Sequence, residues 1–196
     1  MKKFICLLFA LVLCLSVAMA ESVPSKTTSD MTEVKDVVAE NLPADAGFTV
    51  TIPVEEEVVA VANTEVSKLV EAAKTADVTT YFGTVTDSKG NEVVLTELLE
   101  TETVNVFEFM PIEVKEYVEE YGSVNVTLTF STPYAKDEKV VVLLGLVTVN
   151  EDGTQTVAWT AYEGVVVDEG AIQVEFDPET LKMIQDGTAL IAIVSK

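Results

Sequence analysis

The sequence predicts a mainly β protein with two or three short helices, and two observations carry this prediction. Valine occurs 34 times and threonine 23 times among the 196 residues, and β-branched side chains favour the extended backbone of a sheet. Several segments also alternate apolar and polar residues with a period of two, which is typical of strands with one buried face. We therefore expect a C-terminal antiparallel β-sandwich preceded by a small α+β segment.

Residues 1–20 have the pattern of an export signal. Two lysines precede the apolar stretch Phe4–Val17, and Ala18 and Ala20 stand where signal peptidase prefers small residues. This stretch is shorter than the roughly 20 residues that span a bilayer. We expect cleavage after Ala20 and no stable membrane insertion afterwards. The protein is then secreted or associated with the cell surface, or periplasmic if the source has an outer membrane.

The segment 21–46 is predicted to be a polar linker or mobile arm. It contains Pro24 and Pro43, and its only helical pattern, around residues 31–40, is weak. Such a composition offers few side chains for a buried core.

The small α+β segment is expected over residues 47–103. Apolar residues and threonines alternate in FTVTI (48–52), which predicts a strand that ends at Pro53. A helix is expected to follow, with Asn63 or Thr64 as its N-cap, because the next apolar residues share one helical face: Val66, Leu69, Val70 and Ala73. Strands are then expected at 78–82 and 92–95.

The connection between the two segments is ambiguous. Residues 111–122 (PIEVKEYVEEYG) match a helix that ends at Gly122, whereas Ile112 and Val114 could instead prolong the strand predicted before them. Both alternatives stay open at the level of the sequence.

The second segment, 104–196, carries the clearest strand patterns. The segment 139–149 is apolar on both faces, so we expect this strand at the centre of the fold. A short helix is expected at 178–186, with Asp177 as its cap and Pro178 at its first position. The predicted strands are 123–130, 139–149, 156–167, 171–176 and 188–195.

Four runs in this segment, SVNVTLTF, EKVVVLLGLV, TVAWTAY and AIQVEF, together have the length and spacing of sandwich strands. At the level of fold class, residues 104–196 resemble the immunoglobulin-like or fibronectin-like β-sandwich modules of secreted and cell-wall proteins of Gram-positive bacteria. The chain lacks a cysteine pair around Trp159 and has an additional short helix. The resemblance implies a fold and an exported location, and it transfers no functional residue.

Composition excludes several kinds of chemistry. The chain has no histidine and no arginine, and its two cysteines, Cys6 and Cys14, lie in the predicted signal. The mature chain would therefore lack imidazole catalysis, thiol nucleophiles, disulfides and Cys/His zinc sites. The net charge of −21 repels nucleic acids and anionic membranes. We expect no enzymatic activity and no nucleic-acid partner.

Two alternatives use the abundant carboxyl groups. Two carboxylates about 5 to 10 Å apart could hydrolyse a glycosidic bond, which leaves a small carboxylate-dependent carbohydrate-active enzyme as one alternative. A calcium-stabilised β-domain is the other, with Asp87, Asp152 and Asp168 as weak metal candidates in loops. None of the three loops matches the EF-hand pattern, and hairpin turns explain their Asn, Asp and Gly residues better.

Aromatic residues are the candidates for a binding surface. Tyr162, Tyr134 and Trp159 could stack on sugar rings or anchor a protein partner. Trp159 shares a face with Val157 and is expected in the core, whereas Tyr162 lies on the other face of the strand. The favoured function is an exported non-catalytic module that presents a surface to a protein or glycan partner, or to copies of itself. The sequence does not predict the oligomeric state.

Overall fold

The computed structural model describes residues 30–75 and 78–196, and the predicted signal lies outside this range. The β-rich fold class is confirmed. The helices are α1 (Glu56–Thr75), α2 (Thr79–Phe82), α3 (Leu95–Leu98) and α4 (Pro178–Asp186), with a 3-10 turn at Glu119–Tyr121. The strands are β1 (Asp36–Glu40), β2 (Thr49–Thr51), β3 (Val85–Asp87), β4 (Glu92–Val93), β5 (Asn105–Lys115), β6 (Val124–Thr129), β7 (Val140–Val149), β8 (Gln155–Asp168), β9 (Ala171–Phe176) and β10 (Thr188–Ser195).

Eight strands form one hydrogen-bonded path, in the order β1-β6-β9-β8-β7-β10-β5-β2, with antiparallel neighbours throughout. The small β3–β4 hairpin joins this path at β8, where β3 runs parallel to β8. The path also curls back on itself. Thr32, just before β1, donates its backbone N–H to the Phe109 carbonyl of β5 at 2.9 Å, and β1 contacts β2.

The long strand β8 belongs to both halves of the curled sheet. Its residues 155–164 pair with β7, and its last residues, from Val165 to Asp168, pair with β9. Gly164 stands where β8 leaves β7. A larger side chain would be crowded at this position, because an added Cβ would lie 3.1 Å from Val142 and 3.2 Å from Ile172.

Two apolar cores lie on opposite faces of β5, β7 and β10. The inner core is enclosed by the curled sheet and by α4, with side chains such as Met110, Val142, Ile172, Leu181 and Ile191. The outer core lies under α1, α2 and α3, with side chains that include Leu69, Phe109, Leu143, Trp159 and Leu190. The prediction of a central strand with two buried faces at 139–149 is confirmed for the first half of β7.

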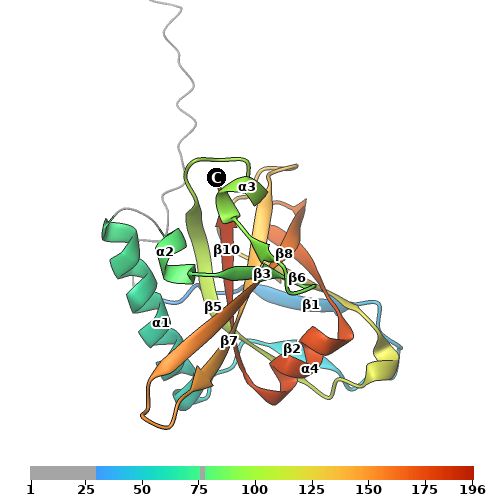
Figure 1. The fold of residues 1–196 in the computed structure, drawn as a ribbon. Helices are drawn as coiled ribbons and strands as arrows, with labels where there is room; N and C mark the ends of the chain where they lie inside the picture. Colours follow the sequence, from blue (N-terminus) through green and yellow to red (C-terminus); the bar gives the residue numbers. More distant parts are fainter. Residues whose placement is uncertain (1–29, 76–77) are drawn as a thin grey trace, which may run out of the picture.

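Figure 1 shows α1 along one side of the sheet and α4 on the opposite side. The helix α4 agrees with its sequence signals, because the Asp177 carboxylate caps it by accepting from the Thr180 N–H at 2.9 Å. None of the helices built from residues 30–75 and 78–196 combines the length and the apolar composition that a bilayer crossing requires.

Part of the predicted linker 21–46 is in the sheet. Asp36–Glu40 form β1 and pair with β6 in register from Asp36↔Thr129 to Glu40↔Asn125. Only Val37 and Ala39 pack against the inner core from this strand, and two inward side chains are too few for a clear period-two signal.

Local predictions between residues 56 and 115 were corrected in two places, and one open alternative was resolved. The first helix begins at Glu56 rather than near Asn63, since two glutamates in its first turn favour its N-terminus. Residues 79–82 form α2 instead of a strand, because Val78 and Phe82 are both buried on one face of a helical turn. The ambiguous segment 111–122 continues β5 up to Lys115, so the strand alternative is correct.

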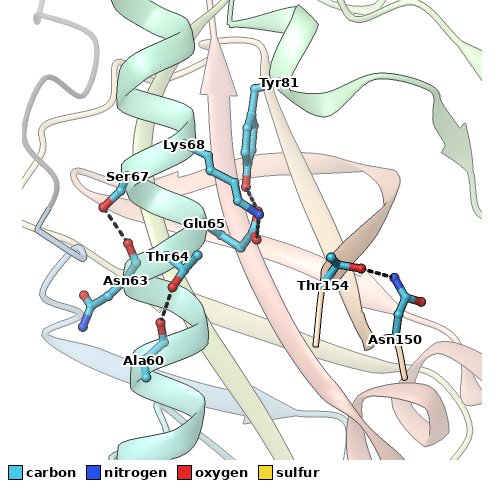
Figure 2. A network of polar contacts seen from close by, with 9 residues as sticks. All are labelled: Ala60, Asn63, Thr64, Glu65, Ser67, Lys68, Tyr81, Asn150 and Thr154. Atoms are coloured by element: carbon cyan, nitrogen blue, oxygen red, sulfur yellow. Dashed lines mark hydrogen bonds and ion pairs between the residues drawn. The ribbon is translucent and has the colours of Figure 1, made fainter. Parts of the chain in front are cut away.

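A buried carboxylate anchors α1 to α2. Glu65 is 3% exposed, and it accepts hydrogen bonds from Lys68 Nζ at 2.6 Å and from the Tyr81 hydroxyl at 3.1 Å. Figure 2 shows Glu65 pointing from α1 toward Tyr81, with Lys68 beside it. The Tyr81 ring lies 5.1 Å from Phe82 and 6.0 Å from Trp159 in the outer core. Burial, and then the Glu65 charge, raise the pKa of Tyr81 well above its ordinary value of 10.0.

Gly145→Ala is expected to destabilise the fold by about 1 to 3 kcal/mol, the usual cost of overpacking. A Cβ at this position of β7 would lie 2.6 Å from Val157 Cγ1 and 2.7 Å from the Trp159 ring. Urea unfolding followed by circular dichroism measures the change. Ala158→Val is the control, since Ala158 is exposed on β8 and should change the unfolding free energy by less than about 0.5 kcal/mol. Equal stability of Gly145→Ala and wild type would contradict the packing.

Tyr81→Phe is expected to lower the unfolding free energy by about 1 to 3 kcal/mol at neutral pH, because buried Glu65 loses a donor. Because the pKa of Tyr81 is raised in the folded state, its contribution to the unfolding free energy also depends on pH. The contribution of Tyr81 is complete below pH 10, the pKa of an unfolded tyrosine, and above it falls by up to about 1.4 kcal/mol per pH unit.

Unfolding at pH 9 to 11.5 tests this dependence, with Tyr121→Phe as a control outside the Glu65 network. The stability of Tyr81→Phe should fall less steeply above pH 10 than that of wild type. Identical slopes would contradict the assignment.

Candidate functional site

The structure does not bring the three predicted binding aromatics together on a surface. Trp159 is 3% exposed and lies in the outer core, as the sequence predicted. Tyr134 is 4% exposed and packs into the inner core, so its assignment to an exposed surface is wrong. Tyr162 is half-buried, with its ring 5.1 Å from Phe176 and its hydroxyl 2.7 Å from Thr180 Oγ1.

Tyr134 is paired with a buried acid. Its hydroxyl donates to Glu108 Oε1 at 3.3 Å, and Glu108 is 3% exposed. The register of β5 and β10 shifts beside Glu108, and the ring of Tyr134 lies 6.1 Å from Phe107 and 6.4 Å from Phe130. Burial, and then the Glu108 charge, raise the pKa of Tyr134. This pair satisfies a buried carboxylate in the core.

The candidate calcium residue Asp87 closes the turn between β3 and β4. Its Oδ1 accepts from the backbone N–H groups of Lys89 and Asn91, each at 2.9 Å, and its Oδ2 accepts from Asn91 Nδ2 at 2.9 Å. The hydrogen bonds from Asn91 lower the pKa of Asp87. Both carboxylate oxygens are thus used within the turn.

Asp152 and Asp168 each accept hydrogen bonds through Oδ1 in two other turns. Asp152 Oδ1 accepts from the Thr154 N–H at 2.9 Å and from Thr154 Oγ1 at 2.6 Å, and these bonds lower its pKa. Asp168 Oδ1 accepts from the Glu169 N–H at 2.8 Å. Within residues 30–75 and 78–196, no cluster of three or more acidic side chains is arranged to hold a metal ion.

A groove with a volume of about 500 Å³ lies on the outer face of β8, between the start of β7 on one side and β3, β4 and α3 on the other. Figure 1 shows α3 and β3 next to this part of β8. The apolar residues that line it are Val93, Leu98, Val140, Val141, Ala161, Val165 and Val166. The side chains of Val140 and Val166 belong to the inner core, so the other five residues provide its apolar side chains. Tyr162 is also a lining residue, but its ring packs against the inner core beside Phe176.

Two apolar side chains that line the groove, Leu98 and Val165, are exposed. Leu98 on α3 is 36% exposed and Val165 on β8 is 51% exposed, and Val167, near the end of β8, is 49% exposed. Exposed apolar side chains beside a groove are a feature of binding sites.

The groove also carries an excess of carboxylates. Asp87, Asp137, Glu138 and Glu163 line it together with one cation, Lys139. Lys139 Nζ is 2.6 Å from Glu100 Oε1, and this hydrogen bond lowers the pKa of Glu100. The positive charge of Lys139 is therefore compensated by a carboxylate beside the groove.

Two residues at the groove have left-handed backbones although they are not glycine. Asp137 has φ 67° and Glu100 has φ 54°. Glu138, next to Asp137, is held by Ser195 Oγ at 2.7 Å and by the Ala135 N–H at 2.9 Å. The loop before β7 is thus fixed in a conformation that places acidic side chains at the groove.

Sequence reasoning missed this groove because its residues come from distant segments. Leu98, Asp137 and Val165 lie on a helix, in a loop and on a strand that are far apart in the sequence, and no local spacing connects them. One signal was present: in the valine run 165–167 of a strand, side chains must point to both faces, so apolar residues have to be exposed if one face is not covered.

No protein-family model, no curated protein and no solved structure matches the chain. The resemblance of residues 104–196 to immunoglobulin-like modules therefore stays a prediction.

Calcium is expected to raise the melting temperature no more than magnesium does at the same concentration, because the three aspartates lie in separate turns and none belongs to a cluster of acidic side chains in the described part of the chain. Differential scanning fluorimetry measures this difference with the chain in about 5 mM of either chloride. This concentration is roughly saturating for extracellular calcium modules. A rise of several degrees with calcium alone, lost in Asp87→Asn, would contradict the interpretation and support the calcium-stabilised alternative.

Proposed function

We propose that this chain is an exported, non-catalytic module that binds a partner protein through the groove on the outer face of β8. The observation that carries the proposal is the exposure of Leu98 and Val165 at a groove of about 500 Å³. Preformed apolar grooves with a few charged groups at their edges are typical of recognition sites. The export pattern of residues 1–20 supports an extracellular or cell-surface location.

A protein partner is favoured over a glycan. Sugar rings stack on exposed aromatic faces, but Trp159 and Tyr134 are buried and the ring of Tyr162 packs against Phe176. Self-association is disfavoured because copies with a net charge of −21 repel one another. The aliphatic groove suits the side chains of a peptide segment better than it suits either of these occupants.

A carboxylate-dependent enzyme receives less support. Glycoside hydrolysis needs a general acid whose pKa is raised. Asp87 in the groove and Glu100 beside it have lowered pKa values, caused by hydrogen bonds from Asn91 and Lys139. Both groups therefore stay ionised near neutral pH and are poor proton donors.

Selection of a random peptide library on the immobilised chain tests the function. Peptides are expected to be enriched, and Val165→Asp should weaken their binding at least tenfold, because a charge on the apolar wall must be desolvated. Val38→Asp is the matched control, since Val38 is a similarly exposed valine (41%) on β1, away from the groove. Binding should survive this change, as measured by surface plasmon resonance. Failure to enrich any peptide, or equal binding to Val165→Asp and wild type, would contradict the proposal.

A further inference from the structure

The groove presents carboxylates along its whole length. On β8, Ala161, Glu163 and Val165 share the outer face, because alternate residues of a strand point the same way. These three positions are spaced by about 6.6 Å, so apolar and acidic side chains alternate along roughly 13 Å.

Additional carboxylates lie at both ends of this row. Asp87 of β3 is the register partner of Ala161. At the other end, Val140 of β7 is the partner of Gly164, so the loop residues Asp137 and Glu138 lie near Val165, and all of these residues line the groove. Acidic side chains thus stand at one end, in the middle and at the other end of the groove.

The single cation among the lining residues does not offset these charges. Lys139 is bound to Glu100 at 2.6 Å, and the four carboxylates of the lining exceed it by three charges. Such a site attracts a positively charged partner and repels an acidic one.

We propose that the occupant of the groove is an extended basic peptide segment in which lysine or arginine alternates with aliphatic residues. An extended peptide also repeats its side chains every second residue, so one basic residue can face Glu163 while aliphatic residues at two positions before and after it face Ala161 and Val165. Basic residues at the two ends then meet Asp87 and Asp137. This inference rests on the proposed function and adds the chemical class of the partner.

Three synthetic peptides of one design test the inference by isothermal titration calorimetry on the chain. They are Ac-Lys-Thr-Leu-Thr-Lys-Thr-Leu-Thr-Lys-NH₂, in which the lysines and leucines share one face of the extended chain, and its analogues with glutamine or glutamate in place of every lysine. The lysine peptide should bind at least tenfold more tightly than the glutamine peptide, and the glutamate peptide should bind most weakly. Raising the NaCl concentration from about 50 to 500 mM should remove most of the difference between the lysine and glutamine peptides, because salt screens exposed charges.

Charge-neutralising variants locate the effect. Glu163→Gln should weaken the lysine peptide about two- to fivefold, the range for an exposed ion pair, and Asp137→Asn should act similarly, since asparagine tolerates the left-handed backbone at this position. Glu175→Gln, an exposed acid on β9, is the matched control with unchanged affinity. Equal binding of the lysine and glutamine peptides, or equal weakening by Glu175→Gln, would overturn the inference.

The two proposals fail in different ways. If library peptides bind the groove and lose affinity in Val165→Asp, but the lysine peptide does not exceed its glutamine analogue, only the basic class of the partner is overturned. If no peptide binds in either experiment, the proposed function itself is overturned.

Discussion

The burial of β7 and β10 on both faces is the constraint on which the rest of the structure depends. Alternate residues of β10, Ile191 and Ile193, enter the inner core, while Ala192 and Val194 enter the outer core. A strand of this kind cannot shift its register by one residue without exchanging the two sets of side chains. The pair therefore fixes the position of β5 and β8, its neighbours on either side, and the two apolar layers that pack against it.

The groove follows from the way in which β8 leaves this central pair. Beyond Gly164, β8 no longer has β7 beside it and pairs with β9 instead. The helices and the β3–β4 hairpin that cover the outer core end near this point, so Val165 and Val167 remain exposed. The floor of the groove is part of the rigid sheet, whereas α3 and the loop before β7 form its walls. A floor built from paired strands is already ordered, and this reduces the conformational entropy that is lost when a partner binds.

Much of the β-rich fold could be predicted because its signals are local. The strands 123–130, 139–149 and 171–176 alternate or are continuously apolar, and α4 carries a cap, a proline and a closing glycine within ten residues. The strand β1 and the helix α2 could not be predicted in this way, because tertiary packing of a few side chains determines them. The buried pair of Glu108 and Tyr134 was also hidden, since an acid in a strand usually indicates a solvated face, and its hydrogen-bond donor Tyr134 lies 26 positions further along the chain. The groove could not be predicted from local patterns either, because distant segments of the chain form it.

Hydrogen–deuterium exchange of individual amides tests the central claim most directly, because amides in the most stable part of a fold exchange only when the whole molecule unfolds. The amides of Val141–Leu144 in β7 and Ile191–Val194 in β10 should exchange most slowly, with opening free energies equal to the global unfolding free energy. The amides of β3, β4 and α3 should exchange through smaller openings. Exchange of the β7 and β10 amides at the rate of those in α3 would contradict the account.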